Sequence, residues 1–188
     1  MKRLTAITLF CLLFSSAFVA GKGSPEAPGY PDSLRSVWLY TEGIKQSAIA
    51  GDTARARELF LEAIRNDSTY APAWYELAGN LLNTSPDEAV EPARRAFRLD
   101  TANKWYHQFY GQTLLMSDRL DEALKVYRRL LEEDPKDPDN YRIVAALYEQ
   151  KRSPFMALAT LDSAELRFGR IPLLSAMKRR MLVATNQI

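Results

Sequence analysis

The chain has 188 residues, of which 47% are hydrophobic and 26% are charged, and its formal net charge is +2. This composition is close to the globular average and excludes intrinsic disorder as the state of the whole chain. Acidic and basic residues are mixed along every segment, so the concentrated basic field of a nucleic-acid-binding protein is missing. We therefore expect a folded protein that does not bind nucleic acid.

The first segment, residues 1–21, has the pattern of a secretory signal peptide. Lys2 and Arg3 precede an uncharged apolar run over residues 4–20, which is shorter than a comfortable membrane span, and a polar stretch rich in Gly and Pro follows. We predict that this leader is removed, that residues 22–32 form a linker, and that the product is a bacterial periplasmic or secreted protein without a stable membrane span. An uncleaved leader that anchors the protein to a membrane is the alternative.

The next segment, residues 33–171, contains an alanine-led pattern that recurs four times. The opening alanines are 33 or 34 residues apart: Ala56, Ala89, Ala123 and Ala157. Each opens a triplet of small or apolar residues at i, i+4 and i+7, which lies on one face of a helix. Another segment with helical spacing precedes each triplet, so we predict four helix pairs and a further helix after them. The pairs are expected at about 37–70, 71–103, 104–137 and 138–171, and the further helix at 172–188.

Several helix starts are marked by residues that cap helices. A side-chain oxygen at the N-cap accepts a hydrogen bond from one of the first free amides of a helix, and proline is favoured at the first helical position. Five side chains are predicted to cap in this way: Asp52, Ser85, Asp118, Asp137 and Ser153. Ser85 is also predicted to share a capping box with Glu88.

The period, the small-residue triplet and the aromatic-led first helix resemble the tetratricopeptide repeat. The best matches are WYELAGNLL from Trp74 and DEALKVYRRLLEEDP from Asp121, whereas His107 departs from the family as the lead residue of the third repeat. The resemblance implies an all-α fold, a right-handed superhelix (α-solenoid) of antiparallel helix pairs that bury their apolar stripes against one another. The helix at 172–188 would then either cap the array or begin a fifth repeat of a longer protein.

The same resemblance implies a binding surface, because the family engages peptides or proteins on the concave groove lined by the first helices. The residues that face this groove form an aromatic and amide-rich set: Trp38, Thr41, Lys45, Tyr75, Asn83, Trp105, Gln108, Gln112, Arg142 and Gln150. Tyr75 and Trp105 are the favoured contacts, because aromatic side chains contribute a large share of interface energy. The alternative is that these side chains are only solvated or are covered by the next repeat.

One subset of the family grips a C-terminal carboxylate with lysine, asparagine and arginine side chains on successive first helices. This chain does not reproduce that clamp, because the corresponding positions hold other residues: Thr41, Lys45, Glu76, Trp105 and Phe109.

Catalysis and metal binding are not predicted. Cys11 is the single cysteine and lies in the leader, and His107 is the single histidine, which leaves no histidine pair or Cys/His pair for a metal or nucleophile site. The sequence contains no phosphate-binding glycine loop, GxSxG or HExxH.

We therefore predict a non-enzymatic scaffold without a cofactor, which binds a protein or peptide partner. One alternative is a small-ligand or glycan receptor, in which Trp38, Tyr75 and Trp105 stack on a flat ligand. Another is the docking or sensory front part of a longer protein.

Overall fold

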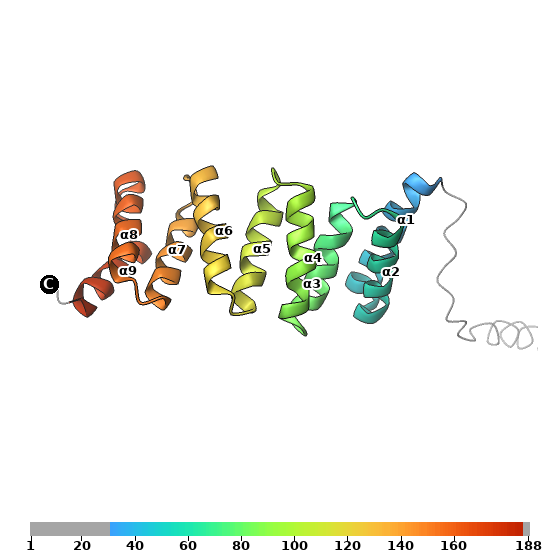
Figure 1. Cartoon of the computed structure of the whole chain (residues 1–188), viewed down its shortest axis with the longest axis horizontal. Coiled ribbons are helices and arrows are strands. Elements are labelled where there is room, and N and C mark those ends of the chain that lie inside the picture. Colours follow the sequence, from blue (N-terminus) through green and yellow to red (C-terminus); the bar gives the residue numbers. More distant parts are fainter. Residues whose placement is uncertain (1–30, 186–188) are drawn as a thin grey trace, which may run out of the picture. The chain divides into compact units, whose positions relative to one another are not determined.

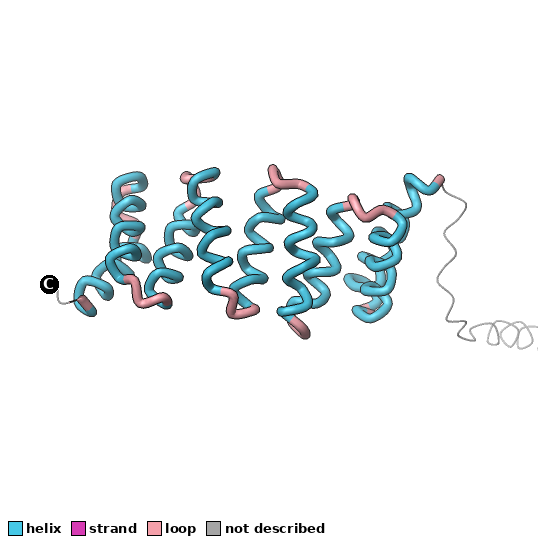
Figure 2. Tube along the Cα trace, viewed as in Figure 1, coloured by secondary structure: helices cyan, strands magenta, loops and turns pink. Residues whose placement is uncertain are grey.

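The computed structural model describes residues 31–185, all of whose regular structure is helical (Figures 1 and 2). Within these residues, nine α-helices follow one another: α1 (Asp32–Lys45), α2 (Thr53–Asn66), α3 (Ala71–Leu82), α4 (Pro86–Leu99), α5 (Lys104–Met116), α6 (Leu120–Glu133), α7 (Pro138–Gln150), α8 (Pro154–Phe168) and α9 (Pro172–Ala184). A π-helical turn, η1 (Gln46–Ala50), continues α1. The predicted leader and most of the predicted linker lie outside the described residues.

Each helix packs against the helix that follows it in the chain, so the array in Figure 1 runs in chain order from α1 to α9. The turns are short, and successive helices are therefore antiparallel. In addition, α3 contacts α5, which brings neighbouring first helices together. The predicted all-α solenoid of helix pairs is confirmed.

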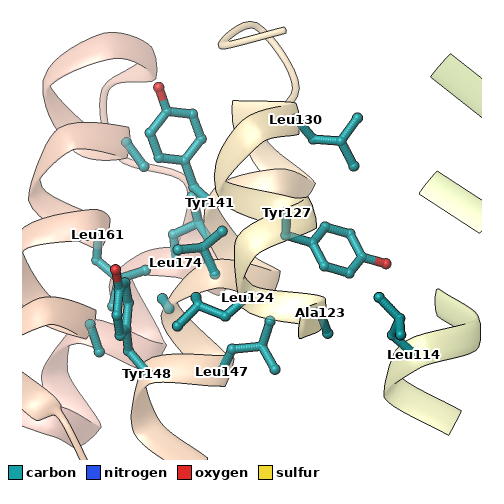
Figure 3. Packing of buried hydrophobic residues seen from close by; sticks show 14 of the residues in the cluster. Leu114, Ala123, Leu124, Tyr127, Leu130, Tyr141, Leu147, Tyr148, Leu161 and Leu174 are labelled. Atoms are coloured by element: carbon teal, nitrogen blue, oxygen red, sulfur yellow. The ribbon is translucent and has the colours of Figure 1, made fainter. Parts of the chain in front are cut away.

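The alanine triplets hold the second helices against their neighbours. All four opening alanines, Ala56, Ala89, Ala123 and Ala157, are completely buried. A methyl group at these positions leaves room for close approach of two helix backbones, and larger side chains then fill the space between repeats. Figure 3 shows this filling around α6, where Tyr127 turns toward α5 near Leu114.

Glycine allows the closest of these approaches. A Cβ atom added to Gly111 on α5 would lie 2.9 Å from Cε2 of Tyr127, and one added to Gly43 on α1 would lie 2.6 Å from Cε1 of Phe60. Both distances are shorter than a van der Waals contact between carbon atoms. The middle residue of a triplet, Phe60 or Tyr127, therefore packs directly onto the backbone of the preceding first helix.

The helix ends agree with the sequence predictions only in part. Asp52 Oδ1 accepts a hydrogen bond from Arg55 N at 2.9 Å, and Asp137 Oδ1 accepts one from Asp139 N at 2.9 Å, as predicted for N-caps. Ser85 and Ser153 occupy N-cap positions, but their side chains make no capping hydrogen bond. The predicted capping box at Ser85 was therefore wrong.

Asp118 was also predicted wrongly, because it closes α5 instead of opening α6. Its φ is 55°, its N–H donates to Leu115 O at 3.2 Å, and the next amide, Arg119 N, donates to Leu114 O at 2.9 Å. These two bonds form a Schellman motif, in which one left-handed residue ends the helix. The turn after α7 repeats the motif, with Arg152 at a φ of 54°.

Candidate binding surface

The ten predicted contact residues all lie on the first helices of the pairs, or at their ends. Trp38, Thr41 and Lys45 belong to α1, and Tyr75 belongs to α3, with Asn83 directly after it. The remaining residues lie on α5 and α7: Trp105, Gln108, Gln112, Arg142 and Gln150. None of the ten is buried, and we call the side chains of these helices that remain accessible the first-helix surface.

Trp105 is the most accessible aromatic side chain among the ten. It is 65% exposed and lies in the first turn of α5, where Asn103 Oδ1 accepts a hydrogen bond from Trp105 N at 3.1 Å. Lys104 Nζ lies 5.3 Å from the centroid of the indole ring. A large exposed indole on an ordered helix costs little conformational entropy to bind, so Trp105 is well placed for an interface.

Tyr75 is more deeply placed than Trp105. Its ring centroid lies 5.2 Å from that of Tyr106 and 4.7 Å from that of Phe109, both on α5. Burial raises the pKa of the Tyr75 hydroxyl above its ordinary value. Tyr75 is thus partly covered by the next repeat and presents its remaining surface from between α3 and α5.

Three of the polar candidates have partners on their own helix. Lys45 Nζ lies 3.3 Å from Glu42 Oε2, and Arg142 Nε lies 2.9 Å from Asp139 Oδ1. Thr41 Oγ1 donates to Val37 O at 2.7 Å. The two ion pairs are near the surface, where such contacts contribute little to stability and can be exchanged for contacts to a ligand.

Sequence reasoning missed a cluster of tyrosines that spans three first helices. Four residues make up this tyrosine cluster: Tyr40 of α1, Tyr70 just before α3, Tyr75 of α3 and Tyr106 of α5. The rings of Tyr40 and Tyr70 meet edge to face at 5.5 Å between centroids. Aromatic residues recur in three successive first helices of the sequence, but only the stacking of repeats brings these rings together.

Glu76 of α3 lies beside the tyrosine cluster and is half-buried. Burial raises the pKa of its carboxyl group, and its charge in turn raises the pKa of Tyr40, Tyr75 and Tyr106. Over residues 31–185, no ion pair or hydrogen bond is formed by the Glu76 carboxylate. Within the described part of the chain, this half-buried carboxylate therefore has no cation paired with it.

These helix pairs agree with the comparison to known sequences, in which the tetratricopeptide repeat model matches residues 80–147. The fold is the tetratricopeptide repeat fold. The match supports the tetratricopeptide repeat family for this chain, whereas no curated protein sequence matches it significantly.

Several solved structures are similar to this helical array. MamA from Desulfovibrio magneticus RS-1 is 15% identical, with a TM-score of 0.66 over 81% of this chain and 86% of that one. YrrB, described as a TPR protein with an unusual peptide-binding site, is 24% identical, with a TM-score of 0.63 over 79% of this chain and 76% of that one. The first TPR of Spaghetti, bound to the HSP90 peptide SRMEEVD, is 18% identical, with a TM-score of 0.55 over 65% of this chain and all (100%) of that one. At these identities the likeness establishes the fold alone.

His107, the departure from the tetratricopeptide pattern, is only 2% exposed and packs as an aromatic residue. Its ring stacks on Phe97 at 4.5 Å between centroids, and its Nδ1 lies 3.2 Å from Glu133 Oε2. Burial lowers the pKa of His107, while the charge of Glu133 opposes this effect. An adjoining cleft of about 400 Å³ is lined in part by Arg129 and Glu133.

Between residues 31 and 185, no three His, Cys, Asp or Glu side chains are grouped so that they could hold a metal ion. None of the helices in this part of the chain combines the length and the apolar character needed to cross a membrane.

Proposed function

We propose that this protein is a non-enzymatic scaffold that binds a partner peptide or protein on its first-helix surface. The observation that carries this proposal is the exposed Trp105 on α5, beside the half-buried Tyr75, in a tetratricopeptide array. Proteins of this repeat family are generally non-catalytic. Two of the similar structures, YrrB and Spaghetti, are described as peptide-binding or peptide-bound, which supports a related role here.

We also propose that the leader over residues 1–21 exports the protein, so that the partner would be found in the cell envelope or outside the cell. This part of the proposal rests on the basic start and the short apolar run of the leader. Mass spectrometry of the N-terminus of the protein purified from an envelope fraction tests it. An intact Met1 start would contradict cleavage.

Photo-crosslinking tests the binding surface. Trp105 is replaced by p-benzoylphenylalanine in the full-length protein, and cells are irradiated before the crosslinked products are separated. The matched control carries the same replacement at Phe155, which is 69% exposed but lies on α8, a second helix. We expect a discrete crosslinked protein from position 105 and none from position 155. Equal products from both positions, or none from position 105, would contradict the proposal.

A further inference from the structure

The tyrosine cluster has the composition of a site for a positively charged group. Tyr40, Tyr75 and Tyr106 are half-buried, so each residue keeps part of its surface accessible. The face of an aromatic ring carries negative charge density and attracts ammonium and guanidinium groups within about 6 Å of its centroid. Helices α1, α3 and α5 all contribute rings: the ring centroids of Tyr40 and Tyr70 lie 5.5 Å apart, those of Tyr75 and Tyr106 lie 5.2 Å apart, and α3 contacts α5.

The electrostatic surroundings of the cluster also favour a cation. At Tyr110, which lies elsewhere in the array, the charges of Arg94, Arg98 and Arg119 counter that of Glu122. Among residues 31–185, the charged groups that shift the pKa of Tyr40, Tyr75 and Tyr106 are all acidic, and Glu76 acts on all three. A half-buried carboxylate without a counter-charge is unfavourable, and a ligand cation would relieve that cost.

An anionic ligand group is disfavoured at the same place. Glu76 occupies the position at which the carboxylate-binding members of the family carry a clamp residue, so a C-terminal carboxylate placed there would meet a like charge. The aromatic faces around it would repel the carboxylate as well. The charge of Glu76 and the ring faces therefore favour a cationic ligand group over an anionic one.

We propose that the tyrosine cluster and Glu76 together bind a lysine or arginine side chain of the partner peptide. Glu76 serves as the counter-ion, and the rings of Tyr40, Tyr75 and Tyr106 contact the cation and its methylene stem. The proposal rests on the peptide-binding function proposed above and specifies the chemistry of one residue of the ligand.

Titration of short peptides into the purified protein tests the proposal. Three probes differ only at the centre of an acetyl-Gly-Gly-X-Gly-Gly-amide peptide, in which X is lysine, acetyl-lysine or glutamate. NMR signals of the tyrosine rings report binding at the cluster. We expect the lysine peptide to bind roughly tenfold more tightly than the acetyl-lysine peptide, and the glutamate peptide more weakly still.

Substitutions locate the effect. Glu76→Gln should reduce the preference for lysine over acetyl-lysine at least about threefold, whereas Glu88→Gln, which makes the same charge change on an exposed residue of α4, should leave it unchanged. Tyr106→Phe should keep the preference because it keeps the ring, and Tyr106→Leu should weaken it.

Equal binding of the lysine and acetyl-lysine peptides would overturn the proposal, and so would a lysine peptide that shifts no tyrosine signal at millimolar concentration. Either result is distinct from failure of the scaffold function, because a crosslink from position 105 would still show that a partner binds the first-helix surface. A preference that survives Glu76→Gln would overturn the role of Glu76 as the counter-ion.

Discussion

Gly111 and Gly79 lie in successive first helices, and the same substitution should have opposite effects at the two positions. Replacement of glycine by alanine inside a helix stabilises a protein by about 0.5–1 kcal/mol when the added methyl group has room. Gly79 is exposed, and its added Cβ would lie 4.0 Å from Phe109 Cζ, which is an ordinary contact. We expect Gly79→Ala to gain roughly this amount of stability.

At Gly111 the added Cβ would lie 2.9 Å from Cε2 and 3.0 Å from Cζ of Tyr127, and 3.2 Å from Val126 Cγ1. The Tyr127 ring is itself 4% exposed, so it has little room to move. Overpacking of a core costs about 1–3 kcal/mol, which exceeds the gain in helix propensity. Gly111→Ala should therefore lose about 0.5–2 kcal/mol.

Urea and thermal unfolding, followed by circular dichroism at 222 nm, measure both variants against the parent protein. For an array of this size, a change of 1 kcal/mol corresponds to about 2–4 °C in Tm. The two variants should therefore move in opposite directions from the parent. If Gly111→Ala unfolds at or above the parent midpoint, the Tyr127 ring moves aside at little cost, and the argument from close approach is wrong.

Three further predictions concern single residues. Asp118→Gly should stabilise the protein by about 0.5–1 kcal/mol, because glycine adopts the φ of 55° without the strain of a side chain. The control Asp87→Gly, in the first turn of α4, should destabilise the protein. A loss of stability in Asp118→Gly would refute the assignment of Asp118 to the left-handed position of the turn. Burial raises the pKa of Glu76, so stability falls as pH rises from the ordinary value of 4.5 through the raised pKa. Glu76→Gln should remove this loss, and unfolding curves at pH 4 and pH 7 should show a gain over the parent only at pH 7. Burial lowers the pKa of His107 below 6.5, so the stability that depends on its neutral form is present above pH 6.5 and is lost as pH falls through the lowered pKa. Compared with His107→Phe, the parent should lose stability between pH 7 and pH 5, and parallel curves would show that folding does not lower the pKa of His107.

The helix pairs could be predicted because the residues that pack between helices recur at short, regular intervals in the sequence. The triplet opened by Ala123 lies on one helix face at i, i+4 and i+7, and its period of 34 residues repeats without help from distant contacts. The turn at Asp118 could not be read in the same way. An aspartate suits both an N-cap and a left-handed C-terminal position, and only the backbone φ distinguishes the two.

The candidate binding surface was predicted less completely than the fold. The repeat period placed Trp105 and Tyr75 on first helices, because the position of a residue within its own repeat can be read from the local sequence. The tyrosine cluster depends on how far one repeat is displaced from the next, which decides that Tyr106 meets Tyr75 and that Glu76 lies near Tyr40. The displacement between two repeats cannot be predicted from the sequence of one repeat alone.

Packing of each helix mainly against its chain neighbours has a consequence for how the array comes apart. In such arrays stability is the sum of each repeat's own stability and the interfaces with its neighbours, so opening spreads from the ends and not from one global core. Amide protons of α5 and α6, which have neighbours on both sides, should exchange with solvent more slowly than those of α9, which packs on α8. Partner binding at Trp105 would therefore engage the part of the array that opens least.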